Sequence, residues 1–465
     1  MNSRSIGLPA ASALLACLLA AGAPASADGD TKAEIEALRE ELRQMRAEYE
    51  SRIAELESRL DVAEQAAAST PAADANRPAA ASGYAAAPPQ SPQTVSVARD
   101  SSFNPAIGVT FQGQAWAYEQ DPETWFIPGF PLGGEAGPAP EGLSLAETEI
   151  TVSANVDDKF TAMLNMPVVV EDGEVVVELE EAWVETLALP GGAAIRMGRF
   201  FSNIGYLNPR HFHSWDFADQ PLAYQVFLGN QYLDDGLQFR WLAPTDFYLE
   251  LGAEALRGDR FPAGGAANSG LGSKTLFAKT GGDAGLSNSW QFGLAWLTAD
   301  AVERESGGED DPLLFSGTTD LYIADFVWKW APNGNSKQRN FKFQAEYLWR
   351  SEDGSYTLPE GPAGPWDVDQ SGWYAQAVYQ PFPRWRFGAR IEQLSGDTPG
   401  PEWIGTPLYP QGSDPRRYSL MADWSNSEFS RLRLQYNHDR ATLEADNQLG
   451  LQYIFSIGAH GAHSF

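Results

Sequence analysis

The sequence is short of cysteine, of basic residues and of long apolar runs. Its 465 residues include one cysteine, Cys17, and 32 Lys plus Arg against 62 Asp plus Glu, a formal net charge of −30. A chain so acidic lacks the positive field that phosphate recognition needs, so we expect no nucleic-acid partner. The mean hydropathy is negative, which excludes a bundle of transmembrane helices.

Motifs of the common enzyme classes are also lacking. The chain has no Gly-x-Ser-x-Gly, no nucleotide-binding loop and no His-Glu-x-x-His. Ser430, His438 and Asp439 lie near one another in the sequence, but nothing in their spacing singles them out. We therefore predict that the protein is not an enzyme.

The first 27 residues have the pattern of a secretory signal. Arg4 precedes an apolar run, and Ala25-Ser26-Ala27 is a small-x-small cleavage site. The alternatives are a short membrane anchor and lipoprotein processing at Cys17. Cleavage after Ala27 removes the only cysteine and so excludes disulfides and thiol catalysis in the mature chain.

Residues 28–68 are rich in Ala, Glu, Leu and Arg and contain a heptad stripe. Ile35, Leu38, Leu42 and Met45 begin a 3–4 spacing that continues to Ala63. This spacing predicts a coiled coil, with a lone solvated helix as the alternative. Residues 69–102 are rich in Ala, Pro, Ser and Gln, which is typical of an extended linker.

From residue 103 to residue 465 the dominant pattern is strict alternation. Phe341, Phe343, Ala345, Tyr347 and Trp349 alternate with polar or charged residues such as Lys342 and Glu346. Period-two alternation predicts strands that have one apolar and one polar face. We expect about sixteen strands, starting near residues 106, 145, 160, 177, 194, 236, 247, 275, 289, 321, 341, 372, 385, 417, 430 and 447.

Three features favour an all-β transmembrane antiparallel barrel over a soluble sandwich. Short turns such as Asp157-Asp158 alternate with longer loops, expected at 121–142, 257–274, 299–319, 352–370 and 395–416. Tryptophans of the apolar phase, including Trp328 and Trp385, lie near strand ends, as in an aromatic girdle. The opposite phase carries charge, which suits a wet lumen. An even strand number returns both ends to the periplasm, where the coiled coil also belongs.

Together these segments resemble a Gram-negative outer-membrane porin. The runs IPGFPLGGEAGP (127–138), GRFFSNIGYLNPRHFHSWDFADQPLAYQ (198–225) and IGAHGAHSF (457–465) are similar to a proteobacterial porin-like family. Its members are often labelled zinc-regulated TonB-dependent outer-membrane receptors. The resemblance implies location in the outer membrane, contact with its lipid and a homotrimer formed through barrel and coiled coil. The terminal Phe465 resembles the signal read by the barrel assembly machinery. TonB-dependent receptors, however, resemble twenty-two-stranded barrels with a folded plug, whereas this chain has about sixteen expected strands with only the linker before them.

The long stretch 202–233 follows the fifth expected strand. In sixteen-strand porins this loop folds into the lumen, and here we expect it to form the constriction. It carries Arg210, His211, His213, Asp216 and Asp219. The pattern His-x-His-x-x-Asp suits a divalent metal such as zinc, with His211 and His213 as the ligands. The alternative is a polar constriction that binds no ion. His460 and His463 form a second pair near the C-terminus.

The polar phase predicts a lumen with unequal charge on its two sides. The acidic residues expected there are Glu147, Glu149, Glu181, Glu185, Glu250 and Glu254, and the basic ones are Lys342, Arg350, Arg386, Arg390, Arg431 and Arg433. Opposed rows produce a transverse field across a pore, whereas paired charges merely neutralise one another. The sequence therefore predicts a channel for small hydrophilic solutes, with divalent metal ions such as zinc among the candidates. The alternatives are a TonB-linked receptor and a non-conducting envelope tether or adhesin.

Overall fold

The computed structural model describes residues 105–458, except 134–135, 172–173, 266–269, 308–311, 360 and 362. The expected signal peptide, coiled coil and linker, as well as His460, His463 and Phe465, lie outside the described residues. None of the helices in the described part of the chain is long and apolar enough to cross a bilayer.

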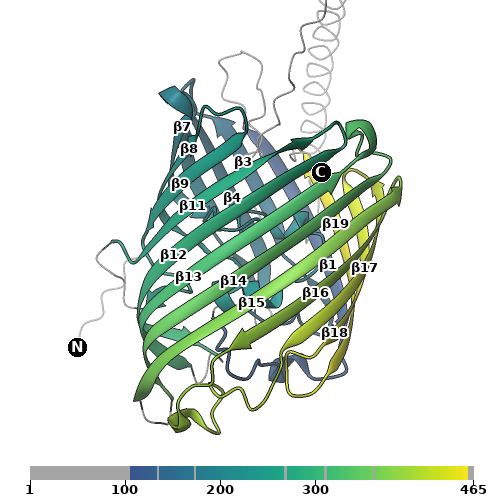
Figure 1. The fold of residues 1–465 in the computed structure, drawn as a ribbon. Helices are drawn as coiled ribbons and strands as arrows, with labels where there is room; N and C mark the ends of the chain where they lie inside the picture. Colours follow the sequence, from purple (N-terminus) through teal and green to yellow (C-terminus); the bar gives the residue numbers. More distant parts are fainter. Residues whose placement is uncertain are drawn as a thin grey trace, which may run out of the picture. The chain divides into compact units, whose positions relative to one another are not determined.

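Within residues 105–458, sixteen strands form a closed antiparallel barrel, which confirms the predicted fold (Figure 1). Closure is made by β1 and β19, which pair from Gly108 opposite Gly458 to Ala117 opposite Leu449. The wall consists of β1 (Ala106–Ala117), β3 (Thr148–Asn155), β4 (Phe160–Glu171), β6 (Glu181–Thr186), β7 (Ala193–Phe201), β8 (Leu233–Leu242), β9 (Tyr248–Leu256), β11 (Ser273–Ala284), β12 (Asn288–Ser306), β13 (Leu313–Trp330), β14 (Asn340–Thr357), β15 (Ala363–Phe382), β16 (Trp385–Gly396), β17 (Arg416–Ser427), β18 (Ser430–Asp439) and β19 (Asp446–Gly458).

Short elements extend this wall or occupy its loops. β2 (Gly142–Leu145) pairs with β1, and β5 (Glu174–Val177) pairs with β4. β10 (Gly264–Gly265) pairs in parallel with β12. The helices are η1 (Pro122–Thr124), η2 (Pro190–Gly192), η3 (Phe212–Ser214), α2 (Leu222–Leu228), η4 (Pro332–Gly334) and η5 (Pro401–Trp403).

The two phases of each strand separate as the alternation predicts. On β18, Leu434 is 49% exposed on the outside, whereas Arg433 beside it is 1% exposed inside the barrel. Outward rings form cross-strand pairs toward one end, with Trp290 opposite Trp328 and Trp385 opposite Trp424. An apolar outer face with aromatic rings near its edge is what a barrel surrounded by lipid requires.

The two ends of the barrel differ. One end has short turns such as 156–159, 285–287 and 383–384, and the other has longer loops such as 118–141 and 397–415. We call these the short-turn end and the long-loop end. β1 starts and β19 finishes at the short-turn end, because each pairs with the other there.

Two of the expected long loops are wrong. Most of 299–319 and 352–370 is strand, since β12 and β13 are joined by a connection at 307–312 and β14 and β15 by one at 358–362 (Figure 1). Alternation continues through these stretches, and their inward side chains pack together. Phe315, Tyr356, Trp366 and Val368 form a buried cluster with Trp403 of the last long loop. Burying these rings favours long hairpins over irregular loops.

Candidate functional site

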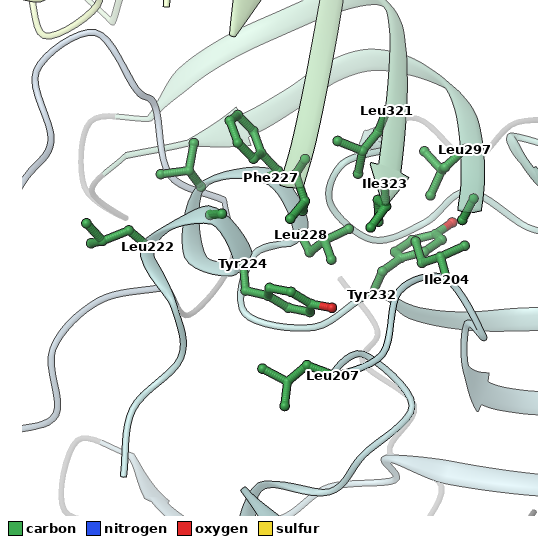
Figure 2. Packing of buried hydrophobic residues seen from close by; sticks show 14 of the residues in the cluster. Ile204, Leu207, Leu222, Tyr224, Phe227, Leu228, Tyr232, Leu297, Leu321 and Ile323 are labelled. Carbon is green, nitrogen blue, oxygen red and sulfur yellow. The ribbon is translucent and has the colours of Figure 1, made fainter. Parts of the chain in front are cut away.

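The segment 202–232, between β7 and β8, lies inside the barrel, and we call it the plug loop. β7 is the fifth strand of the wall, so this is the loop that the sequence placed at the constriction. Its only α-helix, α2, ends at Gly229, whose φ of 56° is left-handed and suits glycine. Tyr224, Phe227 and Leu228 of this helix belong to the same buried cluster as Leu321 and Ile323 of β13 (Figure 2). The plug loop therefore has an apolar core of its own within a polar lumen.

Carboxylates of the barrel wall accept hydrogen bonds from backbone N–H groups of the plug loop. Glu346 of β14 accepts from the N–H groups of Tyr206 and Leu207, both at 3.0 Å. Glu254 of β9 accepts from the N–H of Asn203 at 2.9 Å, and Glu392 of β16 accepts from that of Leu222 at 2.6 Å. These bonds hold the plug loop at three separate strands. Glu346 and Glu392 belong to the polar phase, but local spacing gave no sign that they contact this loop.

The two aspartates of the plug loop contact basic residues of the wall. Asp216 lies 2.9 Å from both Lys342 Nζ and Arg386 Nη1. Asp219 lies 2.5 Å from Arg390 Nη2 and 3.3 Å from Arg417 Nη1. Burial alone raises the pKa of each aspartate, but the neighbouring cations outweigh burial and hold both pKa values below their usual range. We call Lys342, Arg386, Arg390 and Arg417 the basic wall.

The two histidines contact the opposite side of the lumen. His211 Nδ1 is 3.4 Å from Glu149 Oε2 and 3.3 Å from Glu180 Oε2, and its Nε2 is 3.0 Å from Glu181 Oε2. His213 Nδ1 is 2.6 Å from Glu149 Oε1. Burial lowers the pKa of His211, but hydrogen bonds to Glu180 and Glu181 overcome it, so the pKa lies well above its ordinary value. We call Glu149, Glu180 and Glu181 the acidic wall.

The proposed combination of histidines with Asp216 is therefore wrong, because Asp216 is paired with the basic wall. The structure instead brings Glu149, Glu180 and His211 together, with one ligand atom from each lying within 4.8 Å of the others. His213 adds a hydrogen bond to Glu149 at the same place. One imidazole and two carboxylates are donors that suit zinc. The sequence pattern identified His211 but gave no means of finding Glu180, which is about thirty residues away.

Arg210 packs on a tyrosine of the plug loop. Its guanidinium carbon is 4.0 Å from the centre of the Tyr206 ring, and its Nε donates to the Tyr206 carbonyl at 3.2 Å. The Tyr206 hydroxyl is buried without a hydrogen-bond partner among the described residues. Burial raises the pKa of Tyr206, but Arg210, Lys342 and Lys329 outweigh it and lower the pKa to about 7.

The other predicted lumen charges also have partners. Arg433 donates to the carbonyl of Trp215 at 2.7 Å, and Arg431 donates to that of His213. Glu250 accepts from Asn203 Nδ2 at 3.1 Å. Arg350 donates to the carbonyl of Val226 at 3.3 Å, and Glu185 pairs with Arg196 at 2.7 Å. Many of the charged groups in the lumen thus have partners within the protein.

One cavity, of about 260 Å³, lies inside the barrel between the plug loop and the wall. It is bounded by Trp116 of β1, Gln448 of β19 and Arg417 of β17, and by Phe212 and Gln225 of the plug loop. Glu147, which follows β2, also lines it. The lumen is therefore narrowed by the plug loop but contains polar space beside it.

These features define a β-barrel of the membrane-embedded type whose lumen is narrowed by one of its own loops. The chain belongs to the same family as an uncharacterized protein of Aquifex aeolicus (strain VF5), with which it is 33% identical over 341 residues, covering 70% of each chain. No family model matches the sequence.

Solved barrels are similar to the chain at a low level. OmpT of Vibrio cholerae has a TM-score of 0.45 at 9% identity, covering 76% of this chain and 99% of that chain. The anion-selective porin of Comamonas acidovorans has the same values. OprB of Pseudomonas putida has a TM-score of 0.40 at 11% identity, covering 76% and 94%. Similarity this weak does not bear on activity.

Proposed function

We propose that the protein is an outer-membrane channel through which small hydrophilic solutes diffuse passively, with the plug loop as its selective constriction. The observation that carries the proposal is the way this loop is held. Its aspartates pair with the basic wall and its histidines with the acidic wall, so it spans the lumen between them. An open sixteen-strand barrel encloses a wide aqueous channel, and a loop fixed across it restricts passage to small solutes.

The location in the outer membrane rests on the outward apolar face and on the expected signal peptide. The first strand starts and the last strand ends at the short-turn end. Barrels of this type have their short turns in the periplasm, so we assign the short-turn end to the periplasm and the long loops to the cell exterior. The coiled coil then lies in the periplasm, where it supports a homotrimer. Barrel lipid contacts and insertion by the barrel assembly machinery belong to the same proposal.

The test uses the full chain in planar lipid bilayers. Replacing Asp216 and Asp219 together by Asn releases the plug loop from the basic wall and leaves more positive charge in the lumen. We expect a larger single-channel conductance. We also expect the reversal potential in a salt gradient to shift in the direction of greater anion selectivity. Asp353→Asn, at an exposed position of β14, is the matched control and leaves both values unchanged.

Heat-modifiable migration on gels shows whether each variant has formed its barrel. A folded double variant with the conductance of the unsubstituted protein contradicts the constriction. A protein that conducts no ions, yet takes up solute when an energised partner is present, supports the TonB-linked receptor instead. A folded barrel that is inactive in both assays supports the envelope tether.

A second candidate function, regulation or transport of zinc, is favoured by the group formed by Glu149, Glu180 and His211. If zinc binds there, micromolar zinc reduces the current, and His211→Ala abolishes the reduction. His438→Ala is the matched control, because His438 lies on β18 and contacts Asn447 instead. Since only neutral imidazole binds a metal and the pKa of His211 is raised, zinc inhibition should strengthen as pH increases. If zinc does not change the current, the zinc proposal fails and the channel proposal is unaffected.

A further inference from the structure

The cavity of about 260 Å³ beside the plug loop has a mixed lining. Aromatic rings and carboxamides lie among its lining residues, together with three charged side chains. The cavity lies inside the barrel wall, between β1 and β19 on one side and the plug loop on the other.

Trp116 and Tyr118 supply an apolar surface on one side. Their rings are nearly parallel, with centres 6.0 Å apart and an angle of 15° between the planes. Trp116 Nε1 donates to Gln114 Oε1 at 3.2 Å, and Tyr118 Oη donates to the carbonyl of Ala139 at 2.7 Å. These bonds fix both rings in place.

The position of the indole depends on Gly450. This residue is directly opposite Trp116 on the neighbouring strand. A Cβ at position 450 would lie 2.6 Å from the Trp116 ring. Because glycine has no side chain, the indole packs directly against the wall and leaves the cavity open.

Carboxamide groups supply hydrogen bonds to the same cavity, from Gln114, Gln220, Gln225, Asn230 and Gln448. An amide both donates and accepts, so it matches a hydroxyl group in either role. Gln225 is 2% exposed, and its Nε2 donates to the Gln220 carbonyl at 3.3 Å. Its Oε1 is buried and has no partner among the described residues. A buried acceptor without a donor is costly, and a ligand hydroxyl would satisfy it.

Three charged groups line the cavity, Glu147, Asp219 and Arg417, and ion pairs hold the last two. Arg417 Nη2 is 2.8 Å from Asp439 Oδ2, and Arg417 Nη1 is 3.3 Å from Asp219 Oδ2. Asp219 also pairs with Arg390. Charges already paired with the protein offer little net attraction to a charged ligand, and the carboxylate of Glu147 repels anions, so this lining disfavours an anionic solute and admits a neutral one.

We propose that this cavity is a binding subsite for one ring of a neutral carbohydrate. The C–H face of a pyranose packs on Trp116 and Tyr118, and its hydroxyls exchange hydrogen bonds with the carboxamides, including Gln225 Oε1. The volume is just below the ~300–1,000 Å³ typical of sites for larger ligands, which suits a single ring. The inference rests on the proposed channel function and specifies its solute class.

The experiment measures glucose inhibition of the ionic current through the full-length protein in planar bilayers. We expect a saturable decrease in current as D-glucose is added, with little effect of glycine at the same concentration. Trp116→Leu and Gln225→Leu should each raise the half-inhibiting glucose concentration about tenfold or more. Trp290→Leu is the matched control, because Trp290 is 39% exposed on the outer face, and should leave this concentration unchanged.

Each outcome bears on one of the two proposals. Normal conductance without glucose inhibition overturns the carbohydrate subsite and leaves the channel. Equal inhibition in the unsubstituted protein and in both variants also overturns it, because glucose then binds elsewhere. If the protein conducts no ions, the channel proposal fails. Equilibrium dialysis of the detergent-solubilised protein with labelled glucose then decides the subsite, since saturable binding that Gln225→Leu abolishes supports it and absence of binding overturns it.

A further variant tests the subsite even if Trp116→Leu does not fold. Gly450→Ala displaces the indole from the wall into the cavity, while every residue of the plug loop remains. Weaker glucose inhibition with unchanged folding supports the subsite, and unchanged inhibition counts against it.

Discussion

Replacing Glu346 should release the plug loop while leaving the barrel closed. Glu346 is 2% exposed and its carboxylate accepts four hydrogen bonds. Two come from the N–H groups of Tyr206 and Leu207, at 3.0 Å each, and two from the hydroxyls of Tyr224 and Tyr374, at 2.9 and 2.5 Å. Three of these four donors belong to the plug loop.

Glu346→Leu leaves all of these donors without an acceptor. At about 1–3 kcal/mol for each buried unsatisfied group, the three donors of the plug loop cost roughly 3–9 kcal/mol if no water enters. Water that enters the lumen lowers this cost, and the loop gains most by moving away from β14. Glu346→Gln keeps one acceptor oxygen and should have about half the effect. The strand pairing between β14 and its neighbours does not involve this carboxylate, so the barrel should persist.

The assay combines single-channel recording with limited proteolysis. We expect Glu346→Leu to conduct more current, with more noise, and to be cleaved faster within 202–232, with Glu346→Gln between it and the unsubstituted protein. Glu402→Gln, at an exposed position, is the control. If Glu346→Leu folds and has the unsubstituted conductance and cleavage rate, this carboxylate does not hold the plug loop.

Four further predictions concern the outer face, the lumen face, the acidic wall and the coiled coil. Leu434→Arg should lower the free energy of unfolding by about 2–4 kcal/mol in urea titrations of vesicle-embedded protein, because Leu434 faces lipid near the midplane; unchanged unfolding would contradict that placement. Arg433→Leu should also destabilise, by about 2–6 kcal/mol, because Asp423 and the Trp215 carbonyl each lose a donor. The raised pKa of His211 contributes stability that is complete below the ordinary histidine pKa of ~6.5 and is lost as pH rises through the raised value. Proteolytic cleavage of the plug loop should therefore increase toward alkaline pH. His211→Gln should remove that pH dependence. A peptide of residues 31–68 should sediment as a helical oligomer, and a helix-poor monomer at high concentration would count against both the coiled coil and the trimer.

The sequence by itself determined which residues face outward and where most strands begin. Phe387 and Leu434 are exposed and Arg390 and Arg433 are buried, as their alternation predicted. Alternation is a local property, because successive side chains of a strand point to opposite faces whatever the strand pairs with. The position of the plug loop after the fifth strand was likewise visible as the longest stretch without alternation.

Only the tertiary structure decided which charges meet inside the barrel. The spacing of His211, His213 and Asp216 resembles a metal-ligand pattern, yet Asp216 pairs with Lys342, which is 126 residues away in the sequence. Glu346 is one polar residue of an alternating strand, and its role depends on N–H groups 139 and 140 residues earlier. Closing the barrel brings these groups together, and the low dielectric of the filled lumen makes an unpaired charge so costly that the loop adopts the position in which its charges find partners.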